Sequence, residues 1–295
     1  MSSSENQKQI SLTLVVDKKK QKVLYAEAGK DFVDVLLSFL TWPLGTVSRL
    51  VSEKSTVQPC RFYCISSLRE SVDKLDRTYF SAYENKEMLL NPRSPMDDFY
   101  RNLGWVSYEN TPFSKGFKGY LPVTTCYIVS DDLTVMPSKA DTTLWMLRNF
   151  GLDCVTERLT VSVTQKEVPD LLKFSLWSRA PLTDLFLRKK LIQIHNSGTL
   201  ELSKVKINEC QGKVGVRMKL KVVVSKSERI VLFAEAQEDF INQLLIFLTI
   251  PLATVERLQQ DNSGLGCIDN LYKSSAEFDA AIDFDPTIFD LKGKL

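Results

Sequence analysis

Carboxylates that recur at matched positions of the chain form the first candidate for catalysis. Glu27 and Asp31 lie four residues apart, and Glu235 and Asp239 repeat this spacing. Two carboxyl groups act as general acid and base only if they converge and their pKa values differ. Acidic residues are also favoured at helix N-termini, where they interact with the helix dipole. The structural role explains the pattern without further assumptions, so we assign no catalytic residue here.

Cysteines form the second candidate, either as nucleophiles or as metal ligands. Cys64 and Cys267 recur in similar sequence contexts, but a thiolate nucleophile needs a base and His195 is the only histidine. A buried free cysteine behaves instead as a small hydrophobic residue. Cys60 and Cys64 could provide two metal ligands, yet no second pair of Cys or His completes a tetrahedral site. We therefore predict no catalytic, cofactor-binding or metal-binding residue and no cofactor.

Basic residues form the third candidate, a surface for nucleic acid. The run Lys18–Lys20 is typical of a solvated hairpin tip, and its counterpart near Lys226 has lost the charge excess. A helix-turn-helix would place several base-reading residues on its second helix, and the repeat offers only Arg49 or Arg257. With 38 basic and 36 acidic residues, the net charge of +2 does not favour nucleic acid as a partner.

Composition and the N-terminus bear on where the protein acts. The 295 residues are 44% hydrophobic and 25% charged, as in an ordinary soluble globular protein. The polar segment 1–8 has no apolar region typical of a secretory signal, and no stretch has the apolar length that crosses a bilayer. Six scattered cysteines then indicate free thiols in a reducing compartment. We expect no membrane insertion and a cytoplasmic or nuclear location.

An internal repeat is the strongest feature of the sequence. Residues 12–50 align without a gap onto residues 220–258, and 16 of the 26 positions from 25 to 50 are identical. Similarity continues from Cys64 to Cys267, and the second copy is expected to be truncated. Such identity indicates a duplication.

The repeat predicts a β-hairpin followed by two helices. Leu12, Leu14 and Val16 alternate with other residues before a Lys-rich turn, which is typical of a strand in a hairpin. From residue 31 apolar residues follow the spacing of an amphipathic helix, and Thr41 could cap a short helix that starts at Pro43-Leu44. We expect both copies to bury these stripes, including Phe32, Phe39 and Leu40 and their counterparts Phe240, Phe247 and Leu248.

The remaining chain completes an α+β fold in which antiparallel sheets are covered by helices. Ser130–Asp132 predicts the turn of a middle hairpin, residues 142–150 and 171–174 predict helices, and residues 159–163 predict a strand. The predicted organisation is a first repeat copy at 1–90, a linker at 91–119, a middle α+β segment at 120–208 and a second, truncated copy at 209–295.

Several strings resemble the plant family known only as domain of unknown function 674. They are Ser11–Asp17, Ala26–Ala28, Pro43–Thr46, Leu68–Asp76, Leu89–Pro95, Ser130–Leu133 and Ser178–Asp184. The resemblance implies one or two copies of a long repeat, and it implies no reaction or partner. It also implies a cysteine-rich insert suited to zinc, but the corresponding stretch 99–119 contains no cysteine.

Three classes of function are compatible with the sequence. The absence of a catalytic constellation favours a non-catalytic soluble plant protein that serves as a protein-interaction or scaffolding module. One alternative is an enzyme or small-molecule binder with an unrecognised polar pocket. The second alternative is nucleic-acid binding. A protein partner is possible, and the sequence assigns neither its identity nor the oligomeric state.

Overall fold

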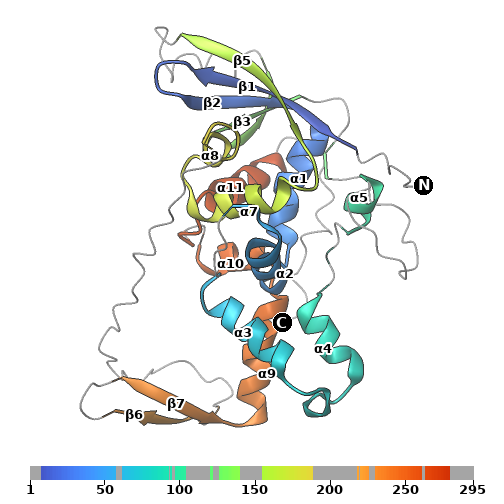
Figure 1. Cartoon of the computed structure of the whole chain (residues 1–295), viewed down its shortest axis with the longest axis vertical. Helices are drawn as coiled ribbons and strands as arrows, with labels where there is room; N and C mark the ends of the chain where they lie inside the picture. Colours follow the sequence, from blue (N-terminus) through green and yellow to red (C-terminus); the bar gives the residue numbers. More distant parts are fainter. Residues whose placement is uncertain are drawn as a thin grey trace.

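Helices and antiparallel strands form the structure, as the sequence predicts. A computed structural model describes residues 8–57, 62–92, 94, 97–103, 120–121, 126–139, 155–188, 218, 220–225, 230–260 and 263–279. A five-stranded sheet lies at one end of the molecule and a separate two-stranded hairpin at the other, with helices between them (Figure 1). None of the helices in the described part is long and apolar enough to cross a membrane.

The five-stranded sheet is built around the hairpin of the first repeat copy. All neighbouring strands are antiparallel, and the order is β4-β3-β2-β1-β5. The Lys-rich turn between β1 and β2 is exposed, and the Asp17 carboxylate accepts hydrogen bonds from the backbone amides of Lys19 and Lys20 (2.8 and 3.0 Å). The strands are β1 (Ile10–Asp17), β2 (Lys22–Ala28), β3 (Tyr127–Ser130), β4 (Val135–Pro137) and β5 (Thr156–Val163).

The helices of the first copy follow directly from its apolar stripe. In α1 (Lys30–Thr41) the residues from 32 to 41 are all buried, and α2 (Leu44–Arg49) starts after Pro43. Thr41 does not cap α2, which corrects the sequence prediction. It is the last residue of α1, and its hydroxyl donates to the carbonyl of Ser38 (2.8 Å), whereas Pro43 occupies the N-cap position.

Further helices of this half and of the middle segment cover the core. The predicted middle hairpin and strand are confirmed as β3, β4 and β5, and the helix predicted at 171–174 lies within α7 (Val168–Trp177). The residues from 142 to 150, where a helix is predicted, lie outside the described part. The additional elements are a π-helical turn at Leu50–Lys54, α3 (Tyr63–Lys74), a 3-10 turn at Arg77–Tyr79, α4 (Tyr83–Leu90), α5 (Asp97–Asn102), α7 (Val168–Trp177) and α8 (Pro181–Phe186).

The second copy repeats the element order of the first. Leu12 pairs with Ala28 and Leu220 pairs with Ala236, and both hairpins have a register irregularity at equivalent positions, after residues 15 and 223. The duplication is therefore visible in strand register as well as in sequence. The elements are β6 (Leu220–Val224), β7 (Val231–Ala236), α9 (Glu238–Ile246), a 3-10 turn at Phe247–Thr249, α10 (Leu252–Leu258) and α11 (Ile268–Asp279).

The two copies meet at matched residues. Pro43 and Pro251 form an isolated antiparallel bridge. The amide of Leu44 donates to the carbonyl of Ile250 (2.9 Å), and the equivalent amide of Leu252 donates to the carbonyl of Trp42 (3.2 Å). These reciprocal bonds between positions 208 residues apart give the contact a local two-fold character. Gly45 permits this approach, because a Cβ there would lie 2.9 Å from the carbonyl oxygen of Leu248.

Helix α11 of the second copy belongs to the core of the first half. The Ser274 hydroxyl accepts a hydrogen bond from the amide of Val135 in β4 (3.0 Å), and the Asn270 side chain donates to the carbonyl of Asp132 (3.0 Å). The ring of Phe278 packs edge-on against Tyr127 at 6.0 Å. The N-terminal half therefore depends on a helix from the other end of the chain.

Burial differs between the copies, and this corrects the prediction that both bury their stripes. Phe32, Phe39 and Leu40 are fully buried, as is Leu248, but Phe247 is 46% exposed and Phe240 is only half-buried. The physical reason is visible in Figure 1, where α9 leads away from the hairpin β6–β7 toward the helices. Among the described residues, no helical layer comparable to that of the first hairpin therefore covers the second.

Candidate functional site

The matched carboxylates do not form an acid–base pair. Glu27 on β2 forms an ion pair with Arg158 on β5. Asp31 instead accepts from Lys8, with 2.6 Å between Nζ and Oδ2. In the second copy Glu235 pairs with Lys221 at 2.9 Å. Glu27, Asp31 and Glu235 each have a separate cationic partner, so this geometry supports the structural interpretation.

The matched cysteines lie in different environments. Cys64 on α3 is exposed, whereas Cys267 precedes α11 and is buried. The Cys267 thiol lies 3.1 Å from the carbonyl oxygen of Ser178, and burial raises its pKa to about 12. Such a thiol is protonated at neutral pH and acts as a small buried hydrophobic group. Cys60 and His195 lie outside the described residues, and within the described ranges no cluster of three His, Cys, Asp or Glu could hold a metal ion.

The basic candidates include one surface ion pair and one helix that packs inside the protein. Lys18 in the Lys-rich turn lies 3.4 Å from Glu157. Helix α2, the second helix of the helix-turn-helix pattern, has four buried residues and packs against α3. Ser48 on its inner face exchanges a hydrogen bond with Ser66 of α3 (2.9 Å). This face is therefore used inside the protein.

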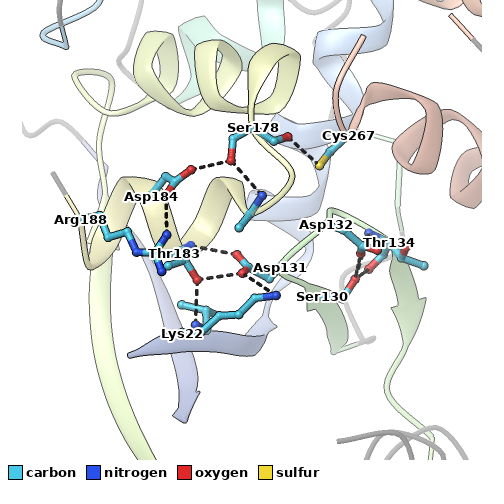
Figure 2. A network of polar contacts seen from close by, with 12 residues as sticks. Lys22, Ser130, Asp131, Asp132, Thr134, Ser178, Thr183, Asp184, Arg188 and Cys267 are labelled. Carbon is cyan, nitrogen blue, oxygen red and sulfur yellow. Dashed lines mark hydrogen bonds and ion pairs between the residues drawn. The ribbon is translucent and has the colours of Figure 1, made fainter. Parts of the chain in front are cut away.

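A buried polar network joins two of the strings named in the sequence analysis, Ser130–Leu133 and Ser178–Asp184, through residues 52 positions apart. Figure 2 shows Asp131, in the turn between β3 and β4, beside Thr183 of α8. The Asp131 carboxylate accepts from the amide (2.9 Å) and the hydroxyl (2.8 Å) of Thr183, and the Thr183 oxygen accepts from the amide of Val23 in β2 (2.8 Å). Lys22 lies 3.9 Å away, and burial raises the pKa of Asp131. The network fastens α8 to the sheet.

A second part of the network connects the end of α7 to α11. The Ser178 hydroxyl donates to Asp184 and accepts from the amide of Ala180 (2.8 Å), while the Ser178 carbonyl receives the thiol of Cys267 (Figure 2). A hydroxyl nucleophile would need a neighbouring base with an available acceptor atom. Here the hydroxyls already hold carboxylates and backbone amides in place. The arrangement supports a structural joint between three segments of the chain.

Buried carboxylates elsewhere have the same kind of role. Asp170 of α7 accepts from the Ser55 hydroxyl (2.6 Å) and the Thr56 amide (2.8 Å), and so ties α7 to the first copy. Asp34 of α1 binds Lys30 and accepts from the amides of Tyr120 (2.8 Å) and Leu121 (3.2 Å). Burial raises the pKa of Asp34 to about 6 despite these partners.

Apolar side chains on the second copy are exposed where their counterparts are buried. Leu14 is fully buried, but the equivalent Val222 is 43% exposed; Leu24 is 9% exposed, but the equivalent Leu232 is 59% exposed. We call these exposed residues together the second-unit surface. Those of the hairpin lie on both of its faces, because Phe233 pairs with Val223 and Val222 pairs with Ala234. The residues are Leu220, Val222, Val224, Val231, Leu232, Phe233, Ile241, Ile246 and Phe247.

Together these features describe an α+β protein of duplicated hairpin–helix units, and comparison with known proteins identifies its family. The profile described as "Protein of unknown function (DUF674)" matches residues 6–118 and 118–289. The chain therefore belongs to the DUF674 family, which confirms the resemblance found in the sequence strings. Comparison with curated proteins and with solved structures finds no match.

Sequence reasoning missed the second-unit surface. Six of its residues repeat positions of the hairpin β1–β2 and three repeat positions of α1, and most of these counterparts are buried, so their types predict burial. The informative signal is that the described residues contain two hairpin–helix copies but one set of strands like β3–β5. Apolar residue types indicate which faces of a hairpin favour burial. The number of segments that can cover such faces indicates how many of them the chain buries itself.

Proposed function

We propose that this protein is a non-catalytic interaction module that binds another polypeptide through the second-unit surface. The observation that carries the proposal is the contrast between matched positions, illustrated by Leu14, which is buried, and Val222, which is exposed. Large contiguous apolar patches on soluble proteins mark interaction sites. Open strand edges likewise favour pairing with another chain.

The energetic argument comes from the apolar area. Transfer of apolar surface out of water contributes about 25 cal/mol per Å². Nine large apolar side chains of the second-unit surface are each more than 40% exposed. Their burial by a partner would provide a driving force without any new catalytic group, and the internally satisfied network at Asp131 and Thr183 supports the same interpretation.

The expected setting is the cytosol or the nucleus of a plant cell. Cys64 and Cys126 are exposed free thiols, and Cys267 is a buried one. Free thiols are typical of reducing compartments. A partner would then be a cytoplasmic or nuclear protein.

Affinity capture from plant extract with matched variants tests the proposal. The test variant is the double substitution Val222→Lys/Phe233→Lys, which places one charge on each face of the β6–β7 hairpin. The control is Leu258→Lys, because Leu258 on α10 is also apolar and 67% exposed but lies outside that surface. We expect a protein that wild type and control retain at least about tenfold better than the double variant, equivalent to about 1.4 kcal/mol. Equal capture by all three proteins, with unchanged circular dichroism, would refute the proposal.

A further inference from the structure

The edges of the two hairpins have different surroundings. In the first copy the outer edge of β1 pairs with β5 along its full length, from Ile10 opposite Val163 to Asp17 opposite Thr156. The outer edge of β2 pairs with β3. In the part of the chain that the structure describes, β6 and β7 form a two-stranded sheet, with no further strand on either edge.

The two hairpins nevertheless have the same edge geometry. Their pairing registers coincide, and the irregularity between Val15 and Val16 recurs between Val223 and Val224. Register and local irregularities determine the twist of a strand and the direction of its free backbone groups. A strand with the shape of β5 therefore fits the edge of β6 as it fits the edge of β1.

Charge also matches this arrangement. In the first copy Glu27 on β2 forms an ion pair with Arg158, which lies opposite Val15 on β5. The carboxylate recurs as Glu235 on β7, where its partner is Lys221 on the hairpin itself. Because an ionised carboxylate has several acceptor sites, Glu235 can also receive a second cationic side chain from a strand added to β6 while it keeps Lys221.

We propose that β6 binds an extended segment of the partner as an added antiparallel strand, in the register in which β5 pairs with β1. The partner segment alternates apolar and polar residues and carries Arg or Lys opposite Val223. Main-chain hydrogen bonds to β6 provide affinity, and the apolar residues join Leu220 and Val222 on one face. This inference rests on the proposed function and specifies how the second-unit surface binds.

A synthetic peptide with the sequence of residues 155–164 is the probe, because it contains β5. Fluorescence anisotropy of the labelled peptide measures its binding to the full chain. Two peptides with alternate N-methylated backbone amides provide the matched control, since successive amides of a strand point to opposite sides. One peptide is methylated at residues 157, 159 and 161, and the other at residues 158, 160 and 162. One of these two sets blocks the amides that face β6, and the other set leaves those amides available.

Strand addition predicts that one methylated peptide binds like the parent and the other binds at least about tenfold more weakly, because two or three hydrogen bonds are lost. Hydrogen exchange should show new protection at residues 220–224 and unchanged protection at 10–17. Equal binding of both methylated peptides, or protection at 10–17 alone, would overturn the proposal. The second result would mean that the peptide replaces the chain's own β5.

The outcomes also separate this inference from the proposed function. If no peptide binds but partner capture still depends on Val222 and Phe233, strand addition is wrong and the interaction surface remains. If the wild-type chain sediments as a dimer and the double variant as a monomer, the second-unit surface binds a second copy of this chain. The proposal that it binds a strand of a different partner is then wrong. If capture and peptide binding both fail, both proposals are refuted.

Discussion

Truncating one aromatic residue in each copy measures how far the two copies differ in the burial of their helices. Phe39 is fully buried at the end of α1, and its ring packs against Trp42 at 5.1 Å between centroids. Its equivalent, Phe247, is 46% exposed. Phe39→Ala removes a buried aromatic side chain and leaves a cavity, which should lower the free energy of unfolding by about 3–5 kcal/mol. Phe247→Ala leaves no enclosed cavity and should cost about 1 kcal/mol.

Urea denaturation followed by tryptophan fluorescence provides the assay, because Trp42 adjoins Phe39 and, on its other side, Tyr100 at 5.5 Å. We expect a large shift of the midpoint for Phe39→Ala and a small one for Phe247→Ala. Partner binding should show the reverse order, with Phe247→Ala the more harmful substitution. Equal destabilisation by both substitutions would refute the reasoning, since it would mean that both copies bury their stripes alike.

Three further predictions concern protons, thiols and metal. Burial raises the pKa of Asp34 to about 6, so the native state holds this proton more tightly than the unfolded chain. The contribution of Asp34 to the free energy of unfolding is thus complete below about pH 4. It is lost as the pH rises through about 6, by about 3 kcal/mol. The free energy of unfolding of Asp34→Asn, measured by unfolding curves, should lack this pH dependence. Iodoacetamide followed by peptide mass spectrometry should label the exposed Cys64 rapidly and the buried Cys267 only after unfolding; equal rates would contradict the assigned burial. Metal analysis after dialysis should find no stoichiometric zinc, and one zinc per chain would implicate Cys60 and Cys64 as ligands.

Local elements of this fold follow from the sequence because short-range patterns determine them. Alternation at Leu12, Leu14 and Val16 gives β1, and the stripe from Phe32 to Leu40 gives α1. The turn at Ser130–Asp132 gives the hairpin β3–β4. In each case the residues that define the element are neighbours along the chain, so periodicity and turn chemistry are sufficient.

Long-range contacts could not be predicted in the same way. The bond between Asp131 and Thr183 joins residues 52 positions apart, and the bridge between Pro43 and Pro251 joins the two copies. An apolar stripe such as that of β6 indicates that burial is favourable, but it does not indicate which segment covers the stripe. The exposure of Val222 therefore required the three-dimensional arrangement, although its residue type matches the buried Leu14 closely.

Residue-resolved hydrogen exchange on the protein alone tests most directly whether the second hairpin is an open copy of the first. Residues 220–224 match residues 12–16 within the strand 10–17, with the same register and mostly the same residue types. We predict that amides of 10–17 exchange only through global or near-global unfolding, whereas amides of 220–224 exchange orders of magnitude faster through local opening. Similar protection of the two segments would contradict an exposed second hairpin, and with it the interaction surface proposed for this protein.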